Sequence, residues 1–97
     1  MRNQIAAANW KMNLTYQQGE ELLDAILKGN IQLADHQQAV FAVPFPYLIM
    51  AQTKLGAKKN YAASAQNCSD QPVGAYTGEV SAEMLHSIGI QDRKSVV

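Results

Sequence analysis

A lysine follows the first apolar run of the chain, within the segment Asn9-Trp10-Lys11-Met12-Asn13. The run Ile5-Ala6-Ala7-Ala8 is typical of a buried strand, and a helix start follows at Thr15. Ligands of parallel α/β sheets bind in loops at the carboxyl ends of strands, so this loop is a candidate binding site. The Lys11 ammonium group is a compact positive charge that suits a phosphate or a developing oxyanion. From spacing alone, the alternative remains that Lys11 is a solvated surface residue and Trp10 a packing residue.

The elements that position this loop alternate between strands and helices. Strands are predicted at residues 5–8, 39–43 and 61–65, where apolar residues follow one another without alternating with polar ones. Helices are predicted from the cap Thr15 to Lys28, over residues 47–55, and from the cap Ser81 to Gly89. Right-handed crossovers between parallel strands put the connecting helices on one face of a sheet. We therefore predict an α/β fold with an open parallel sheet of three strands and helices on one face.

Local patterns predict how each helix is capped and packed. Thr15 and Gln18 form a capping box, and Asp24 and Lys28 have the spacing of an intrahelical ion pair. The apolar residues expected to face the core are Leu22, Leu23, Ile26 and Leu27 in the first helix, Leu48, Met50, Ala51 and Leu55 in the second, and Met84, Leu85 and Ile88 in the third.

Composition excludes several classes of function. The 97 residues carry a net charge of zero, which gives no electrostatic reason to bind nucleic acid or an anionic membrane. No apolar run approaches the roughly 20 residues of a membrane span. The single cysteine, Cys68, excludes an internal disulfide and suits a reducing cytoplasm. His36 and His86 are interpreted as surface residues, and no spacing typical of a metal or cofactor site is present, so we expect neither.

Two separated motifs resemble one known family. The first is the segment from Asn9 to Asn13, and the second joins Ala65-Gln66-Asn67-Cys68 to the stretch from Gly74 to Ser81. In this order, and at about this distance, they resemble the triosephosphate isomerases over residues 5 to 90. The resemblance implies a TIM (β/α)8 barrel, which needs about 250 residues. This chain is expected to hold the first three βα units of an incomplete barrel, in residues 1–90.

The resemblance also implies an activity and a site. The family interconverts dihydroxyacetone phosphate and glyceraldehyde 3-phosphate through an enediol(ate), in glycolysis and gluconeogenesis, using a carboxylate base and a neutral histidine. Asn9 and Lys11 correspond to its substrate-binding residues, and Lys11 also to a catalytic residue. The family is homodimeric, and the loop from Ser69 to Gly78 corresponds to its dimer arm. By resemblance, the arm tip comprises Tyr76, Thr77, Gly78 and Glu79, and the receiving surface comprises Met12, Tyr47, Gln66, Asn67 and Cys68. Without the resemblance, this loop reads as an ordinary exposed loop.

The resemblance ends after Ile90, and residues 91–97 are interpreted as a divergent tail left by truncation or a frameshift. The histidine electrophile and the carboxylate base have no counterpart, since His86 precedes the required position. We therefore expect the chain alone to be inactive. The alternative is a non-catalytic truncated α/β fragment that acts only in assembly or self-association, through unpaired strand edges and an exposed apolar sheet face.

Overall fold

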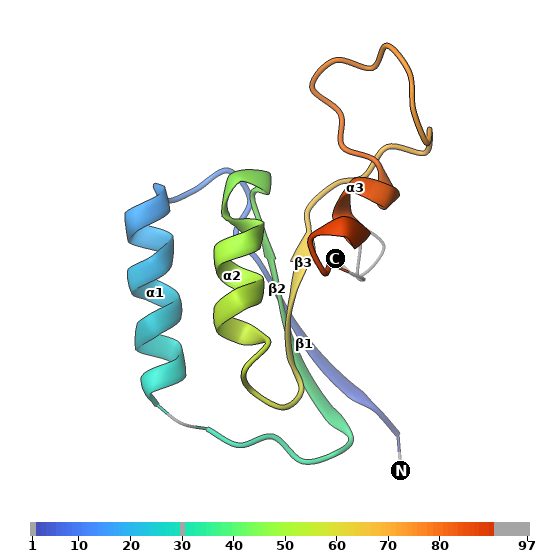
Figure 1. Ribbon diagram of the computed structural model, residues 1–97. Coiled ribbons are helices and arrows are strands. Elements are labelled where there is room, and N and C mark those ends of the chain that lie inside the picture. The colour runs from blue at the N-terminus through green and yellow to red at the C-terminus, as the bar shows by residue number, and fades with distance from the viewer. Residues whose placement is uncertain (1, 30, 91–97) are drawn as a thin grey trace.

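The computed structural model describes residues 2–29 and 31–90 (Figure 1). Strands and helices alternate as predicted, which confirms the α/β class. The predicted divergent tail, residues 91–97, lies outside the described residues. In chain order the elements are β1 (Gln4–Asn9), α1 (Tyr16–Lys28), β2 (Gln37–Val43), the 3-10 turn η1 (Phe45–Tyr47), α2 (Leu48–Leu55), β3 (Tyr61–Ala65) and α3 (Ala82–Ser87).

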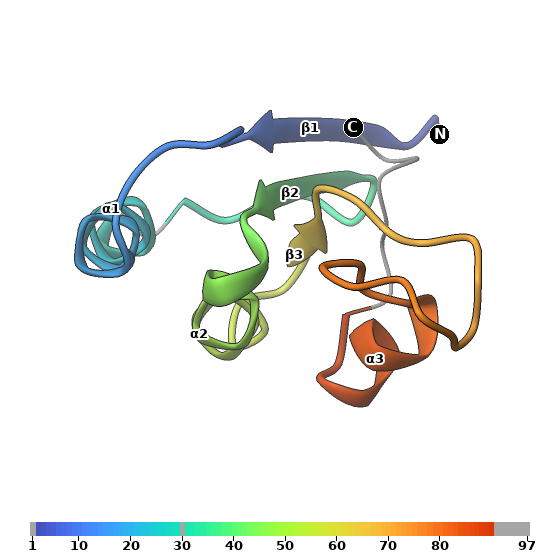
Figure 2. The same ribbon diagram turned by 90° about the horizontal axis from the view of Figure 1, so that it is seen from above.

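The three strands form one parallel sheet in the order β1-β2-β3. Ala6 of β1 pairs with Ala39 of β2, which in turn pairs with Tyr61 of β3. Figure 2 shows α1 to the left of the strands and α2 and α3 below them, so that the helices run around one side of the sheet. This arrangement confirms the predicted open sheet with helices on one face, and it brings the carboxyl ends of the three strands to the same end of the sheet. None of the helices within the described residues is long and apolar enough to cross a membrane.

The core lies between the sheet and the helices. All four apolar residues predicted to face the core from α2 are buried, and Leu23 of α1 and Leu85 of α3 are almost completely buried. The buried cluster comprises Trp10, Leu23, Phe41, Val43, Leu48, Met50, Ala51, Leu55, Ala63, Ala65, Leu85 and Ile90.

Three packing predictions are wrong. Every residue of β1 is exposed, with Ile5 57% exposed, because β1 packs mainly against β2 and contributes no residue to the cluster between the sheet and the helices; it is therefore not buried on both faces. Leu22 and Met84 are also exposed, since each directly precedes a buried leucine, Leu23 or Leu85, and neighbouring helical residues point in different directions. Asp24 pairs across to Lys54 of α2, at 2.7 Å, instead of along its own helix with Lys28.

The predicted helix caps are confirmed at both ends of the chain. Thr15 Oγ1 accepts from the Gln18 backbone N–H at 3.3 Å, and Gln18 Oε1 accepts from the Thr15 N–H at 3.0 Å. Ser81 Oγ accepts from the Met84 N–H at 3.2 Å and begins α3. Gly89, with φ +86°, ends α3, and the Ile90 N–H donates to the Leu85 carbonyl at 2.9 Å, as in a Schellman motif.

Candidate functional site

Lys11 lies in the loop that leaves the carboxyl end of β1. Its backbone has φ +56°, a left-handed conformation that few non-glycine residues adopt. The Lys11 N–H donates to Asn9 Oδ1 at 2.8 Å, so the last residue of β1 supports this turn. The Lys11 side chain is exposed, and within residues 2–29 and 31–90 its ammonium group forms no ion pair.

Gln66 holds the same loop from the other side of β2. Its amide nitrogen donates to the Lys11 carbonyl at 2.8 Å and to the Ala42 carbonyl, near the end of β2, at 3.2 Å. The residues that follow β1 and β3 are therefore joined across the middle strand. Resemblance assigns Gln66 only to a dimer surface. No local pattern in the sequence predicts its contact with Lys11, since the two residues are 55 positions apart.

Trp10 anchors the loop to the protein interior. Its backbone N–H donates to the Ala42 carbonyl at 3.0 Å, and its indole ring is buried against α1. The Trp10 carbonyl accepts from Asn13 Nδ2 at 2.9 Å. Trp10 is thus a packing residue, and its burial leaves the adjacent Lys11 side chain pointing outward on a backbone that is fixed on both sides.

A groove lies beside the Lys11 loop, over the start of α1. Its wall includes Tyr47, whose hydroxyl donates to the Leu14 carbonyl at 2.6 Å, while the Met12 side chain is 95% exposed. Leu14 is a second left-handed residue, with φ +73°, and nothing in the sequence pattern indicated it. The groove is lined by Met12, Asn13, Leu14, Thr15, Gln18, Pro44 and Tyr47.

The loop from Ser69 to Gly78 extends away from the sheet as a closed arm (Figure 1). Its base is joined by the Ser69 N–H, which donates to the Val80 carbonyl at 2.8 Å. Gly74 and Gly78 have φ values of +140° and +87°, which a residue with a side chain adopts only with strain. The four residues of the predicted tip, Tyr76, Thr77, Gly78 and Glu79, are all exposed.

Asn67 and Cys68 connect β3 to this arm. Asn67 Oδ1 accepts from the Cys68 N–H at 2.8 Å, and the part-buried Cys68 thiol donates to the Ser69 carbonyl at 3.4 Å.

The structure gathers three of the predicted site residues, Asn9, Lys11 and Gln66, at the strand ends and puts Met12 and Tyr47 at the adjacent groove. No residue of the arm is among the described residues that line the groove, and Figure 1 shows the arm extending away from α1.

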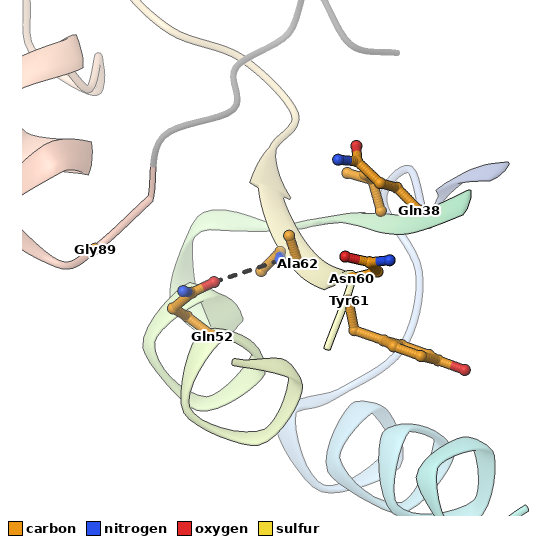
Figure 3. A pocket seen from close by; sticks show the side chains of 8 residues that line it. Gln38, Gln52, Asn60, Tyr61, Ala62 and Gly89 are labelled. Carbon is orange, nitrogen blue, oxygen red and sulfur yellow. Dashed lines mark hydrogen bonds between the residues drawn. The ribbon is translucent and has the colours of Figure 1, made fainter. Parts of the chain in front are cut away.

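A separate cavity of about 340 Å³ lies beside β3 and includes the amino-terminal ends of β2 and β3. Figure 3 shows Gln52 of α2 reaching to β3, where its Oε1 accepts from the Ala63 N–H at 3.4 Å. The lining residues are Gln38, Val40, Gln52, Asn60, Tyr61, Ala62, Ala63 and Gly89. These described lining residues include no carboxylate, imidazole or amine, so they offer no acid–base pair.

Neither histidine of the described residues, and neither group with a shifted pKa, belongs to the Lys11 loop. His86 is exposed on α3, and His36 lies at the amino end of the sheet, where its carbonyl accepts from the Gln4 N–H. The two resolved pKa shifts lie elsewhere. A hydrogen bond and charge from Lys59 lower the pKa of Asp35, and chiefly the hydrogen bond that Lys54 donates to Asp24 raises the pKa of Lys54.

Comparison with known proteins connects this loop to a family. The family model described as triosephosphate isomerase matches residues 4–93. A triosephosphate isomerase of Porphyromonas gingivalis is 42% identical over 92 residues, which cover 92% of this chain and 35% of the relative. Those of Thiobacillus denitrificans and Dichelobacter nodosus are each 45% identical, and the matches cover 92% and 94% of this chain and 34% of each relative.

The chain thus spans about a third of the length of the curated relatives it matches. The match contains all three strand–helix units and the loop that carries Lys11. The open parallel sheet with helices on one face is the architecture expected of part of a TIM barrel. The chain belongs to the triosephosphate isomerase family.

Proposed function

We propose that this chain supplies the substrate-binding lysine of a triosephosphate isomerase, which interconverts dihydroxyacetone phosphate and glyceraldehyde 3-phosphate. The observation that carries the proposal is the exposed Lys11 ammonium group on a loop fixed at the strand ends. Parallel α/β proteins bind ligands at this end of the sheet, and the family similarity supplies the substrate class.

Lys11 and Asn9 have different roles in this proposal. Lys11 balances the negative charge of the phosphate-bearing substrate and of the oxyanion that develops at its carbonyl oxygen. Asn9 uses its Oδ1 to accept from the Lys11 N–H, which leaves its Nδ2 as a neutral donor toward the substrate. One side chain thus contributes charge, and the other contributes a hydrogen bond and supports the turn.

Isomerisation also needs a base and an electrophile at the substrate oxygens. Within the described residues, no carboxylate forms an ion pair with Lys11. General acid–base catalysis contributes about 10²- to 10⁴-fold for each group, so a lysine alone gives little turnover. We therefore expect the 97-residue chain by itself to be inactive and to bind a triose phosphate no more tightly than about millimolar, because the loop from Asn9 to Asn13 carries a single charge, on Lys11.

The proposal includes a cytoplasmic homodimer. The exposed arm, which carries Thr77, would insert into a concave surface of a second chain, and the groove at Met12 and Tyr47 is a candidate for that surface. Cys68 is the single cysteine of the 97 residues, a usage that suits a reducing compartment.

One observation favours the second candidate, a non-catalytic piece that acts in self-association. All six residues of β1 are exposed, including Ile5, and exposed edge strands recruit other strands. In this case the isolated chain forms oligomers whose size depends on concentration, whether or not Lys11 is present.

The test joins residues 1–90 of this chain to the part of the Porphyromonas gingivalis relative that lies beyond the matched region. In a coupled isomerase assay, we expect Lys11→Ala to lower kcat/KM by at least about 10²-fold, because a charge aimed at the developing oxyanion is lost. Lys28→Ala, which removes an exposed lysine from the last turn of α1, is the matched control and should stay near the parent value.

The 97-residue chain is assayed in parallel after removal of host isomerase. Parent-level activity in the Lys11→Ala hybrid would refute the role of Lys11. Robust turnover by the short chain would refute its predicted inactivity. Concentration-dependent oligomers of the short chain, measured by sedimentation, would support the second candidate.

A further inference from the structure

We infer that Gln66 is a positioning residue that holds Lys11 in its left-handed conformation and thereby aims the lysine at its anionic ligand. The inference deepens the proposed function and rests on it for the identity of the ligand. Resemblance assigns Gln66 to the dimer surface. The inference gives it a second role, inside its own chain.

The backbone of Lys11 is fixed at both of its polar groups. Its N–H donates to Asn9 Oδ1 at 2.8 Å, and its carbonyl accepts from Gln66 Nε2 at 2.8 Å. A non-glycine residue with φ +56° persists only where its surroundings hold it. Asn9 belongs to the same turn, so Gln66 is the member of this pair that ties the conformation of Lys11 to the sheet.

Glutamine suits this place because its amide group carries two N–H donors. Gln66 Nε2 lies within hydrogen-bond distance of both the Lys11 and the Ala42 carbonyls, at 2.8 and 3.2 Å. The Ala42 carbonyl also accepts from the backbone N–H of Trp10, so the residue that precedes Lys11 is fixed to the same carbonyl. One amide therefore sets the distance between the end of β2 and the lysine loop.

This arrangement matters for binding because lysine is a flexible side chain. Its four-carbon stem has many rotamers, and only the backbone can limit where the ammonium group reaches. Holding the Lys11 backbone before the ligand arrives lowers the conformational cost of binding. Loss of Gln66 should therefore weaken anion binding without removing any charge.

The first measurement is NMR on the 97-residue chain. A residue with positive φ has a short distance between its own amide and α protons, so Lys11 and Leu14 should each give a strong intraresidue nuclear Overhauser effect. In Gln66→Met, which keeps the length of the side chain and removes its donors, we expect the Lys11 effect to weaken and the Leu14 effect to remain. Leu14 is held by the Tyr47 hydroxyl and not by Gln66.

The matched control is Gln52→Met. It makes the same chemical change at another part-buried glutamine, whose Oε1 accepts from the Ala63 N–H on β3 (Figure 3). This variant should leave the Lys11 and Leu14 signals unchanged. Titration with inorganic phosphate, followed at the Lys11 amide, should then give a dissociation constant about fivefold higher in Gln66→Met than in Gln52→Met.

Each outcome is decisive for the inference. An unchanged Lys11 signal in Gln66→Met, an equal change in both variants, or a wild-type chain without the left-handed signature at Lys11 would overturn it. An altered Lys11 signal with unaltered phosphate affinity would overturn the link to the ligand. Failure of the proposed function is separate, because it appears as parent-level activity in the Lys11→Ala hybrid while the NMR result stands.

Discussion

Trp10 packs its indole ring against the backbone of Gly19, so that a Cβ atom added at Gly19 would lie 3.0 Å from Trp10 Cζ3. This contact joins the residue next to Lys11 to the first turns of α1. A helix interior normally disfavours glycine, and here its missing side chain makes room for the ring. The position of the lysine loop thus depends on a close approach between two parts of the chain.

The contact between Trp10 and Gly19 predicts the effect of a larger residue. We expect Gly19→Leu to lower the free energy of unfolding by about 1 to 3 kcal/mol, because the new side chain overlaps the indole ring. Urea denaturation followed by tryptophan fluorescence measures the change. Gly29→Leu is the control, since only the Ile26 carbonyl comes within 4 Å of a Cβ atom there. A Gly19 variant as stable as the control would show that the ring moves aside at no cost.

The capping box of α1 gives a second prediction. Thr15→Ala removes the hydroxyl that accepts from the Gln18 N–H and should destabilise the protein by about 1 kcal/mol. Thr53→Ala makes the same change inside α2, where the hydroxyl donates only to the Ile49 carbonyl, and should cost less than about 0.5 kcal/mol. Equal urea midpoints for the two variants would contradict a capping role for Thr15.

The ion pairs of Lys54 predict a dependence on alkaline pH. The hydrogen bond with Asp24, together with the charges of Asp24 and Glu20, raises the pKa of Lys54 above 10.5. A raised pKa means that the stabilisation is complete below pH 10.5 and is lost as pH rises through the folded-state value. We therefore expect the difference in urea midpoint between the wild type and Lys54→Met to be largest near neutrality and to shrink above pH 10.5.

The control for this pH dependence is Lys28→Met. Within the described residues Lys28 forms no ion pair. The difference in urea midpoint between the wild type and Lys28→Met should therefore vary less over the same pH range. If the difference in urea midpoint between the wild type and Lys54→Met stays constant up to strongly alkaline pH, then packing of the lysine stem, and not its charge, stabilises the contact between α1 and α2.

The arm gives a prediction about assembly. In the hybrid described above, Thr77→Arg should raise the dimer dissociation constant at least about tenfold, because it buries an unpaired charge in the groove of the second chain. Thr53→Arg, an equal change at an exposed position of α2, should leave the constant unchanged. Sedimentation equilibrium gives both values. Equal dissociation constants would remove Thr77 from the proposed interface.

The sequence by itself determined the features that depend on neighbouring residues. The capping box of Thr15 and Gln18, the cap at Ser81 and the left-handed Gly89 were predicted because each is a local interaction within a few residues. The bounds of β3 were predicted correctly, and those of β1 and β2 were short by one or two residues at their ends. Alternation of apolar runs with helical patterns was enough for the fold class.

Only the tertiary structure decided which distant residues meet. The contact between Gln66 and Lys11 crosses β2, and the pair of Lys54 with Asp24 crosses between two helices, so neither follows from spacing along one element. The exposure of β1 likewise depends on which elements pack against it, chiefly β2, and not on its apolar composition. The lysine was visible in the sequence, but its left-handed backbone was not, because that conformation is held by partners the fold brings from elsewhere.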